Sequence, residues 1–354
     1  MFLVKIVMMK KFFTLAIIYL LPFCLLIYLL AQIFFPQKPN AYTKITLGQP
    51  ISILVAGDSI GAGSGASKPE YNFANRLKAT LQEKYSVSSS IVNTSMSGNT
   101  TYASLIRVFK LKGYNFDLVI LCSGQNDNAS NLGKYYEALI RNIKIKYPNA
   151  EIISVLQSSQ KTYTDKIKTI QTIAQYYNIP TADTIAPFTN GENGSYTSLT
   201  VDGIHPTNRG YAIYAKVLED LINKNVHCKQ KSKTKQLPPP LFPDSLYHVC
   251  FQELSTNILT RTNNIFTGKI NLPKSSLIGM EVYFISGTNY YEVLINEKSI
   301  VKKQFYWKYS DKHFITDIVQ TSITGPSTIT INFGSSKQAN SFKGFFVTYP
   351  KQND

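Results

Sequence analysis

Four short polar stretches of this chain carry side chains that could act together on an ester carbonyl. Ser59 follows the apolar run 51–56, and Asp202 stands three residues before His205. At that spacing, in a turn leading to a helix, a carboxylate can reach the imidazole and fix its tautomer. The chain has four histidines, and the other three lie at residue 227 or later. A serine nucleophile, a histidine base and an orienting carboxylate are the set that serine-dependent ester hydrolysis needs.

The other two stretches supply donors for a developing oxyanion. The backbone N–H of Gly98, in the loop 95–98, and the side-chain amide of Asn126, in the loop 123–127, can both donate, as can the N–H of Ser59. Each fragment alone is ordinary, because Gly, Asp, Asn and Ser are all common in turns. Their joint occurrence favours a catalytic interpretation, with Ser59, Gly98 and Asn126 forming the oxyanion hole.

A parallel sheet is the element that must bring these stretches together. Apolar strand-like runs alternate with stretches of helical periodicity over residues 48–226, which predicts an α/β domain with helices on both faces of the sheet. The polar stretches follow predicted strands, at the sheet edge where such proteins bind ligands. The predicted strands are 51–56, 87–93, 116–122, 151–156 and 179–185, and the predicted helices are 73–85, 100–111, 132–147, 164–177 and 210–223.

The four stretches resemble the sequence blocks of the SGNH/GDSL hydrolase family. All four occur in the family's order, within residues 50–225. The resemblance implies a flavodoxin-like three-layer α/β/α fold that uses no metal and no organic cofactor. Carried over residue by residue, it implies Ser59 as the nucleophile, Gly98 and Asn126 as oxyanion donors, and Asp202 and His205 as the catalytic acid and base.

The same serine also fits a different pattern, the Gly-x-Ser-x-Gly nucleophile elbow of α/β-hydrolases, through Gly57, Ser59 and Gly61. In that fold the serine follows a later strand, and the acid and the histidine are usually far apart in the sequence. Here the serine follows the first strand, and the acid and histidine are three residues apart. We therefore reject the elbow.

The net charge and the cysteine spacing indicate which classes of binding partner the protein has. Lys and Arg total 37 against 21 Asp and Glu, a formal net charge of +16. Most of these cations are lysines, whereas proteins that read nucleic-acid bases rely on arginine forks. We expect no nucleic-acid partner, and we attribute the charge to a solvated lysine-rich surface or to contact with an anionic surface such as lipid headgroups or acidic glycan. No Cys/His spacing indicates a zinc site.

The first 40 residues have the pattern of a membrane anchor. Lysines at positions 5, 10 and 11 precede an uncharged run, 12–35, that is long enough to span a bilayer. These lysines predict a cytoplasmic N-terminus and a catalytic domain outside the cytoplasm, on the periplasmic or extracellular face. The alternative is a protein secreted after signal cleavage, but the run is long for a signal peptide and lacks a good cleavage site.

The composition changes again after residue 226. A lysine-rich and then proline-rich stretch, 227–245, predicts a linker, and residues 246–354 predict an all-β sandwich or jelly roll. Cys228 and Cys250 flank most of this linker and could form a disulfide in an oxidising compartment. The clearest strands of the sandwich are 281–285, 290–295, 327–333 and 344–349.

Aromatic side chains in the predicted sandwich could stack on sugars, although such residues are more often part of a core. Tyr290, Tyr291 and Trp307 are the candidates. A sandwich attached to an esterase often binds glycan in similar architectures, which is an argument by association only.

Together these features predict a membrane-anchored serine esterase that removes acyl groups, with acetyl favoured, from a cell-envelope carbohydrate. Two enzymatic alternatives use the same residues: an O-acyltransferase that passes the acyl group to a glycan, and a lipase or lysophospholipase acting on lipid. A non-enzymatic alternative is an envelope glycan-binding protein in which the sandwich does the work.

Overall fold

A computed structural model describes residues 39–228, 237–242, 249–308 and 312–350; the side chains of residues 249–251, 312 and 350 are not described. The predicted membrane span, 12–35, lies outside this part of the chain. Within the described residues, no helix is both long enough and apolar enough to cross a bilayer.

The first domain contains a five-stranded parallel sheet, which confirms the predicted α/β class. Its strand order is β2-β1-β3-β4-β5, the order of flavodoxin-like folds. All four strand pairs are parallel. The strands are β1 (Ile51–Gly57), β2 (Ser89–Asn93), β3 (Leu118–Cys122), β4 (Glu151–Leu156) and β5 (Thr181–Asp183).

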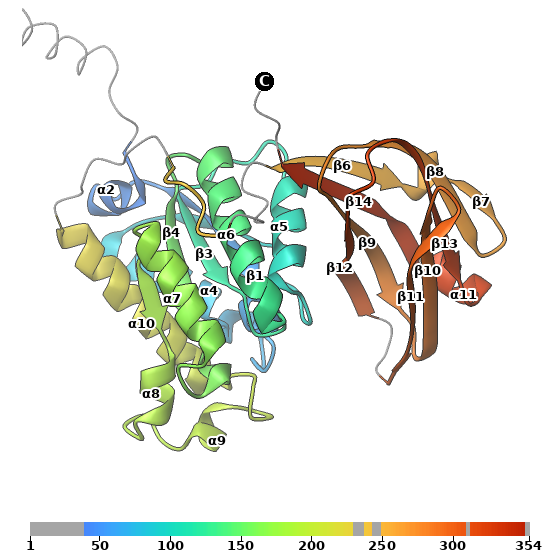
Figure 1. The fold of residues 1–354 in the computed structure, drawn as a ribbon. Coiled ribbons are helices and arrows are strands. Elements are labelled where there is room, and N and C mark those ends of the chain that lie inside the picture. Colours follow the sequence, from blue (N-terminus) through green and yellow to red (C-terminus); the bar gives the residue numbers. More distant parts are fainter. Residues whose placement is uncertain (1–38, 229–236, 243–248, 309–311, 351–354) are drawn as a thin grey trace, which may run out of the picture. The chain divides into compact units, whose positions relative to one another are not determined.

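Helices cover both faces of this sheet (Figure 1). Side chains alternate between the faces along each strand, so Leu54 and Ala56 of β1 join one core cluster while Ile53 and Val55 join the other. The first cluster is closed by α5 (Thr101–Lys110), α6 (Ala129–Lys146) and α7 (Asp165–Tyr176), and the second by α2 (Ala41–Thr46), α4 (Phe73–Tyr85) and α10 (Asn208–His227). Shorter helices are α3 (Ser59–Ala62), α8 (Ile185–Thr189) and α9 (Tyr196–Leu199), and 3-10 turns occupy Pro69–Tyr71, Ser158–Gln160 and Thr256–Ile258.

Side-chain caps define where the long helices begin. Asn72, Thr100, Thr164 and Thr207 precede α4, α5, α7 and α10, and each accepts a hydrogen bond from a backbone N–H three residues on. Such caps satisfy donors that have no partner within the helix. A shorter helix directly after β1, α3, is capped as well, because the Asp58 side chain accepts the N–H of Ile60.

Between the predicted anchor and the first strand, the structure contains a helix, α2, that the sequence did not indicate. Asn40 caps α2, whose residues Ala41, Tyr42 and Ile45 are buried against the first domain. The ammonium of Lys44 also pairs with the carboxylate of Asp117 at 2.7 Å. At six residues, α2 is too short for its apolar positions to give a clear periodicity.

The described part of the predicted linker, residues 237–242, is docked on the first domain rather than free. The buried carboxylate of Glu137 accepts the backbone N–H groups of Leu241 and Phe242, at 2.6 and 2.9 Å. The Arg141 guanidinium, one helical turn further along α6, donates to the carbonyl of Pro238 at 2.6 Å. We refer to residues 237–242 as the strap. The strap, which lies within the predicted linker, is therefore held on the surface of the first domain.

The sequence left a disulfide between Cys228 and Cys250 open. Cys228 is exposed and carries a free thiol. The side chain of Cys250 lies outside the described residues.

The second domain is an antiparallel β-sandwich, as predicted. One sheet has the order β11-β10-β13-β8-β7 and the other β12-β9-β14-β6. Their facing side chains form a separate core around residues such as Met280, Val293 and Ile331. The strands are β6 (Val249–Ser255), β7 (Thr260–Thr262), β8 (Ile265–Leu272), β9 (Ser276–Phe284), β10 (Gly287–Ile295), β11 (Lys298–Trp307), β12 (Lys312–Thr321), β13 (Gly325–Phe333) and β14 (Phe342–Pro350), with helix α11 (Ser336–Ser341) before β14.

Two of the three predicted sugar-stacking residues are engaged in packing. Tyr291 is buried in the sandwich core, so its prediction as a sugar-stacking residue is wrong. The indole of Trp307 packs edge-on against the ring of Phe314, with centroids 5.1 Å apart. The ring of Tyr290 lies under the ammonium of Lys302.

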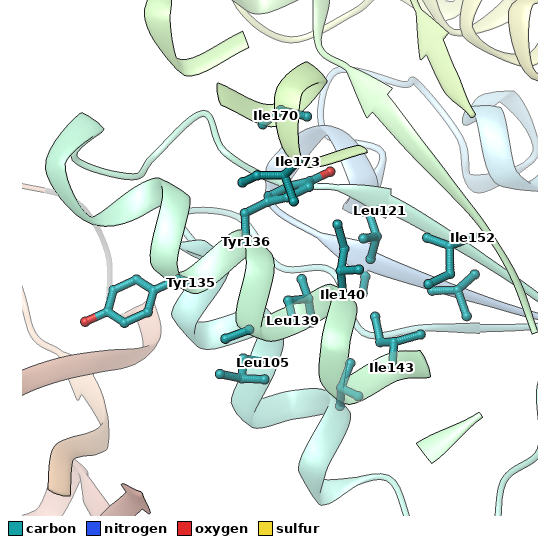
Figure 2. Close-up of a cluster of buried hydrophobic side chains, with 14 of the residues drawn as sticks. Leu105, Leu121, Tyr135, Tyr136, Leu139, Ile140, Ile143, Ile152, Ile170 and Ile173 are labelled. Carbon is teal, nitrogen blue, oxygen red and sulfur yellow. The ribbon is translucent and has the colours of Figure 1, made fainter. Parts of the chain in front are cut away.

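The sandwich shares a hydrophobic core with the first domain. Leu277, Ile315 and Phe346, from β9, β12 and β14, belong to the cluster formed by α5 and α6. Figure 2 shows part of this cluster, with the Tyr135 side chain pointing away from the labelled aliphatic residues. Its hydroxyl donates to the carboxylate of Asp317 on β12 at 2.8 Å. A shared apolar core of this kind fixes the sandwich against α5 and α6.

Candidate active site

The residues predicted to do chemistry follow the strands where the order of the sheet reverses. From β1 the chain steps to β2 on one side and to β3 on the other. In open α/β sheets, ligands bind at the carboxyl ends of the strands at such a point. Ser59 follows β1, Gly98 follows β2 and Asn126 follows β3, so the topology directs all three to one edge of the sheet.

Ser59, His205 and Asp202 form a continuous hydrogen-bonded chain. The distance between Ser59 Oγ and His205 Nε2 is 2.9 Å, and that between His205 Nδ1 and Asp202 Oδ2 is 2.6 Å. Because a carboxylate can only accept, Nδ1 carries the proton, and Nε2 is left to accept from the serine hydroxyl. Nucleophile, base and orienting group thus have the mutual geometry of a serine-hydrolase triad.

The Asp202 carboxylate is organised by its own turn. Its Oδ1 accepts the backbone N–H groups of Ile204 and His205, at 3.0 and 2.8 Å. Partial burial opposes ionisation, but these backbone bonds and the bond from the imidazole outweigh it and lower the pKa of Asp202. Gly203 holds a φ of +79°, which a residue with a side chain adopts only with strain. The turn therefore presents an ionised carboxylate to the histidine.

A tight turn after β2 carries Gly98. The N–H of Asn99 donates to the carbonyl of Met96 at 3.0 Å, and Gly98 between them has a φ of +82°. A positive φ at the third residue of a four-residue turn is the mark of a type II turn. The N–H of Met96 donates to the carbonyl of Gly57, two residues before Ser59, at 3.2 Å. This segment, residues 96–99, is called the oxyanion turn below.

Asn126 lies against the oxyanion turn. Its Nδ2 donates to the carbonyl of Asn99 at 2.8 Å, which uses one of the two amide hydrogens and orients the other. The next residue, Asp127, accepts from the backbone N–H and the hydroxyl of Thr101, at 3.0 to 3.1 Å. The loops after β2 and β3 are thereby tied to each other, and β1 is tied to the loop after β2.

The comparison with family models decides the classification of this domain. The model of the GDSL-like lipase/acylhydrolase family matches residues 55–213, a range that contains Ser59, Gly98, Asn126, Asp202 and His205. Residues 55–213 belong to the GDSL-like lipase/acylhydrolase family. The GDSL-like domain is therefore an ester-hydrolysing enzyme domain.

Solved structures resemble the whole two-domain arrangement. A two-domain esterase active on acetylated mannans matches with a TM-score of 0.72 and 16% identity, covering 88% of this chain and 94% of that one. The same description, with mannopentaose co-crystallised, applies to a second structure with a TM-score of 0.69 and 14% identity, over the same shares. At sequence identities of 14% and 16%, these matches show a similar fold and no more. No curated protein matches the chain.

A buried carboxylate that the sequence did not single out supports the turn that carries Ser59 in the GDSL-like domain. Asp58 is fully buried, and both its oxygens accept from the Gln157 side-chain amide at 2.9 Å. One oxygen also accepts the N–H of Ile60, at 3.0 Å. Burial raises the pKa of Asp58 to about 6 even though these bonds favour the ionised form. The turn that carries Ser59 is thus held to the end of β4.

Sequence reasoning also missed the structural roles of Asp127 and Gln157. In the sequence, Asp127 is only one residue of the loop 123–127, and nothing marks Gln157. Burial raises the pKa of Asp127 to about 6, against the opposing effect of its bonds to Thr101. The position of Gln157 directly after the buried strand β4 was the one signal available. The sequence does not show that its partner is Asp58, 99 residues earlier in the chain.

The described part of the chain contains no cluster of side chains suited to bind a metal ion. No group of three or more His, Cys, Asp or Glu side chains there is arranged to hold an ion. The one carboxylate–imidazole pair at the site, Asp202 and His205, is joined through Nδ1 and faces Ser59 through Nε2.

Proposed function

We propose that the protein is a serine esterase that works through an acyl-enzyme. Ser59 Oγ attacks the ester carbonyl while His205 Nε2 takes its proton, and Asp202 stabilises the imidazolium. The N–H groups of Ser59 and Gly98 and the free amide hydrogen of Asn126 donate to the oxyanion. His205 then returns its proton to the leaving alcohol, and water, activated by the same histidine, releases the acid. The observation that carries this proposal is the continuous chain of short contacts from Ser59 to Asp202.

For the substrate, we propose an acylated carbohydrate, with acetyl as the favoured group. The support is the likeness in fold, over both domains, to an esterase described as active on acetylated mannans. The catalytic edge also carries polar groups beside the oxyanion turn, where the hydroxyls of Ser64 and Ser97 are 2.9 Å apart. Hydroxyls of this kind suit a sugar better than a long acyl chain.

For location, we propose that residues 12–35 anchor the enzyme in a membrane, with both folded domains outside the cytoplasm, where cell-envelope carbohydrate would be the substrate. The apolar run and the lysines before it support this proposal. Extraction of the full-length protein from washed membranes tests it. Detergent should be required, and release by carbonate or high salt alone would contradict it.

The decisive test of the activity is hydrolysis of p-nitrophenyl esters from acetate to palmitate by the full-length chain beside Ser59→Ala. Activity on short esters that is lost in the variant supports the acetylesterase. Rates that rise with chain length would move the proposal to a lipase. Acylated sugar in excess of free acid, after an acceptor sugar is added, would favour an O-acyltransferase. Glycan binding by a folded protein that turns over no ester would favour the non-enzymatic role.

A further inference from the structure

The oxyanion turn is anchored at both ends through one residue, Met96. Its N–H donates to Gly57 and its carbonyl accepts from Asn99, so the backbone position of Met96 sets that of Gly98. The Met96 side chain is also fixed, because its Sδ lies 3.2 Å from the Nη2 of Arg107 on α5. A shift of Met96 would be passed directly to the N–H that faces the oxyanion.

Arg107 is an unusual partner for a thioether. Its guanidinium is partly buried, and its Nε has no hydrogen-bond partner among the described residues. A buried arginine that serves stability alone is normally paired with a carboxylate. Arg107 instead directs Nη2 to two uncharged acceptors, Met96 Sδ and the Nδ1 of His313, each at 3.2 Å.

His313 comes from β12 of the sandwich and is itself held rigidly. Its Nε2 lies 2.6 Å from the carboxylate of Glu281 on β9, and its ring stacks on Tyr283 with centroids 4.8 Å apart. A guanidinium can only donate, so Nδ1 must accept from Arg107, and Nε2–H donates to Glu281. This assigns a neutral imidazole whose two nitrogens are both used.

We propose that Arg107 and His313 are positioning residues through which the sandwich holds the oxyanion turn in its working geometry. The chain of contacts runs from Glu281 through His313 and Arg107 to Met96, and so from the second domain to the oxyanion turn that contains Gly98. The sandwich then contributes to the rate of the chemical step on any ester, besides any role in substrate binding. This inference rests on the proposed function, because it concerns the donors of the proposed oxyanion hole.

Lys110 offers a matched control on the same helix. Its ammonium pairs with Glu281 on β9 at 2.8 Å and with Glu253 on β6 at 3.1 Å, so it also joins α5 to the sandwich. It forms no described contact with the oxyanion turn. Substitution of Lys110 therefore weakens the contact between the domains and removes one partner of Glu281, but it leaves the contacts of Arg107 with His313 and Met96 in place.

The experiment compares Arg107→Met with Lys110→Met in the full-length protein, with p-nitrophenyl acetate as substrate. We expect Arg107→Met to lower kcat about tenfold with KM nearly unchanged, less than loss of a donor outright would cost. Lys110→Met should stay within about twofold of wild type, because Arg107 still holds Met96 in that variant. Equal kcat values in the two variants would overturn the inference while leaving the esterase proposal intact.

Two further measurements test the inference. The first, hydrogen exchange, does not depend on the activity of the variants. Hydrogen exchange of the backbone amides in residues 94–99 should become faster in Arg107→Met and remain unchanged in Lys110→Met; unchanged exchange in both would overturn the inference. At the other end of the chain of contacts, His313→Gln retains an oxygen that can accept from Arg107, whereas His313→Phe retains only the stacking on Tyr283. The Gln variant should recover most of the activity that the Phe variant loses, and equal losses would contradict the positioning role.

Discussion

The two sides of the active site are built in opposite ways. On the acid–base side, Asp202 and His205 are three residues apart, their bonds lie within one turn, and the Asp202 side chain is 49% exposed. On the oxyanion side, the donors come from loops after three different strands and are tied by buried groups such as Asp58 and Asp127. The first side needs only a local turn, whereas the second needs the whole sheet to be folded correctly.

This difference suggests where each side is vulnerable. A local turn tolerates changes elsewhere in the protein, because its hydrogen bonds are set by neighbouring residues. A geometry assembled from distant loops depends on every contact between them, and small displacements of a donor are costly to the transition state. The following predictions test this contrast, beginning with the largest effect.

Replacing the base should have the largest effect. In His205→Ala the serine hydroxyl has no group to take its proton, and we expect kcat for p-nitrophenyl acetate to fall about 10⁴-fold or more. The melting temperature should change little, because the side chain lies at the surface of the site. A fall of less than tenfold in a folded variant would mean that another group is the base.

Removing the orienting carboxylate should come next. Asp202→Ala leaves the imidazole free to rotate and to take the wrong tautomer, and we expect kcat to fall about 10³-fold. Because Asp202 is half exposed, water can replace part of its interaction, which makes this loss smaller than that of the base. Steady-state kinetics across pH check the result, and a variant with wild-type kcat would remove Asp202 from the triad.

On the oxyanion side, loss of a single donor should be milder. Asn126→Ala removes one of three proposed donors and also its bond to Asn99, and we expect kcat to fall about 10²-fold with KM little changed. Asn126→Asp is the informative companion, since it keeps the size but places a negative charge beside the oxyanion. A larger effect on KM than on kcat would assign Asn126 to substrate binding instead.

The smallest effect concerns stability and its dependence on pH. The pKa of Asp127 is about 6 in the folded protein and near 4 when unfolded, so the folded state binds more protons between these values. This carboxylate therefore makes the free energy of unfolding fall as pH rises from about 4 to about 6, by up to about 3 kcal/mol. Asp127→Asn lacks that contribution.

Urea unfolding of wild type and Asp127→Asn at several pH values measures this contribution. The unfolding free energy of wild type minus that of Asp127→Asn should fall as pH rises through the window and stay constant above it. Taking the difference cancels the contribution of Asp58 only in part, because the charge of Asp127 is one cause of the raised pKa of Asp58. A difference that does not vary with pH would show that Asp127 titrates normally.

The sequence predicted the local features of this molecule well. Apolar runs located β1 and β4, and helical periodicity located α4 with the bounds that the structure gives. The strand ends then placed Ser59, Gly98 and Asn126 on one edge of the sheet, because parallel strands impose that arrangement. The Asp202–His205 pair followed from spacing alone.

What the sequence did not reveal depends on contacts between distant residues. The strap lies within the predicted linker, and its docking on the first domain was not foreseen, since a proline-rich segment carries no sign of the buried Glu137 that binds it. The contact between Arg107 and His313 joins residues 206 positions apart, and neither lies in a recognisable motif. Such pairs are set by how the domains pack, which no local pattern encodes.

Covalent trapping tests the central claim most directly. A p-nitrophenyl alkylphosphonate transfers its phosphonyl group to an activated serine and mimics the tetrahedral intermediate. After treatment of the full-length protein, we expect one stoichiometric mass increase on the peptide that contains Ser59, none in Ser59→Ala, and much slower labelling in His205→Ala. Labelling at another residue, or ester hydrolysis that persists in Ser59→Ala, would contradict the assignment of Ser59 as the nucleophile.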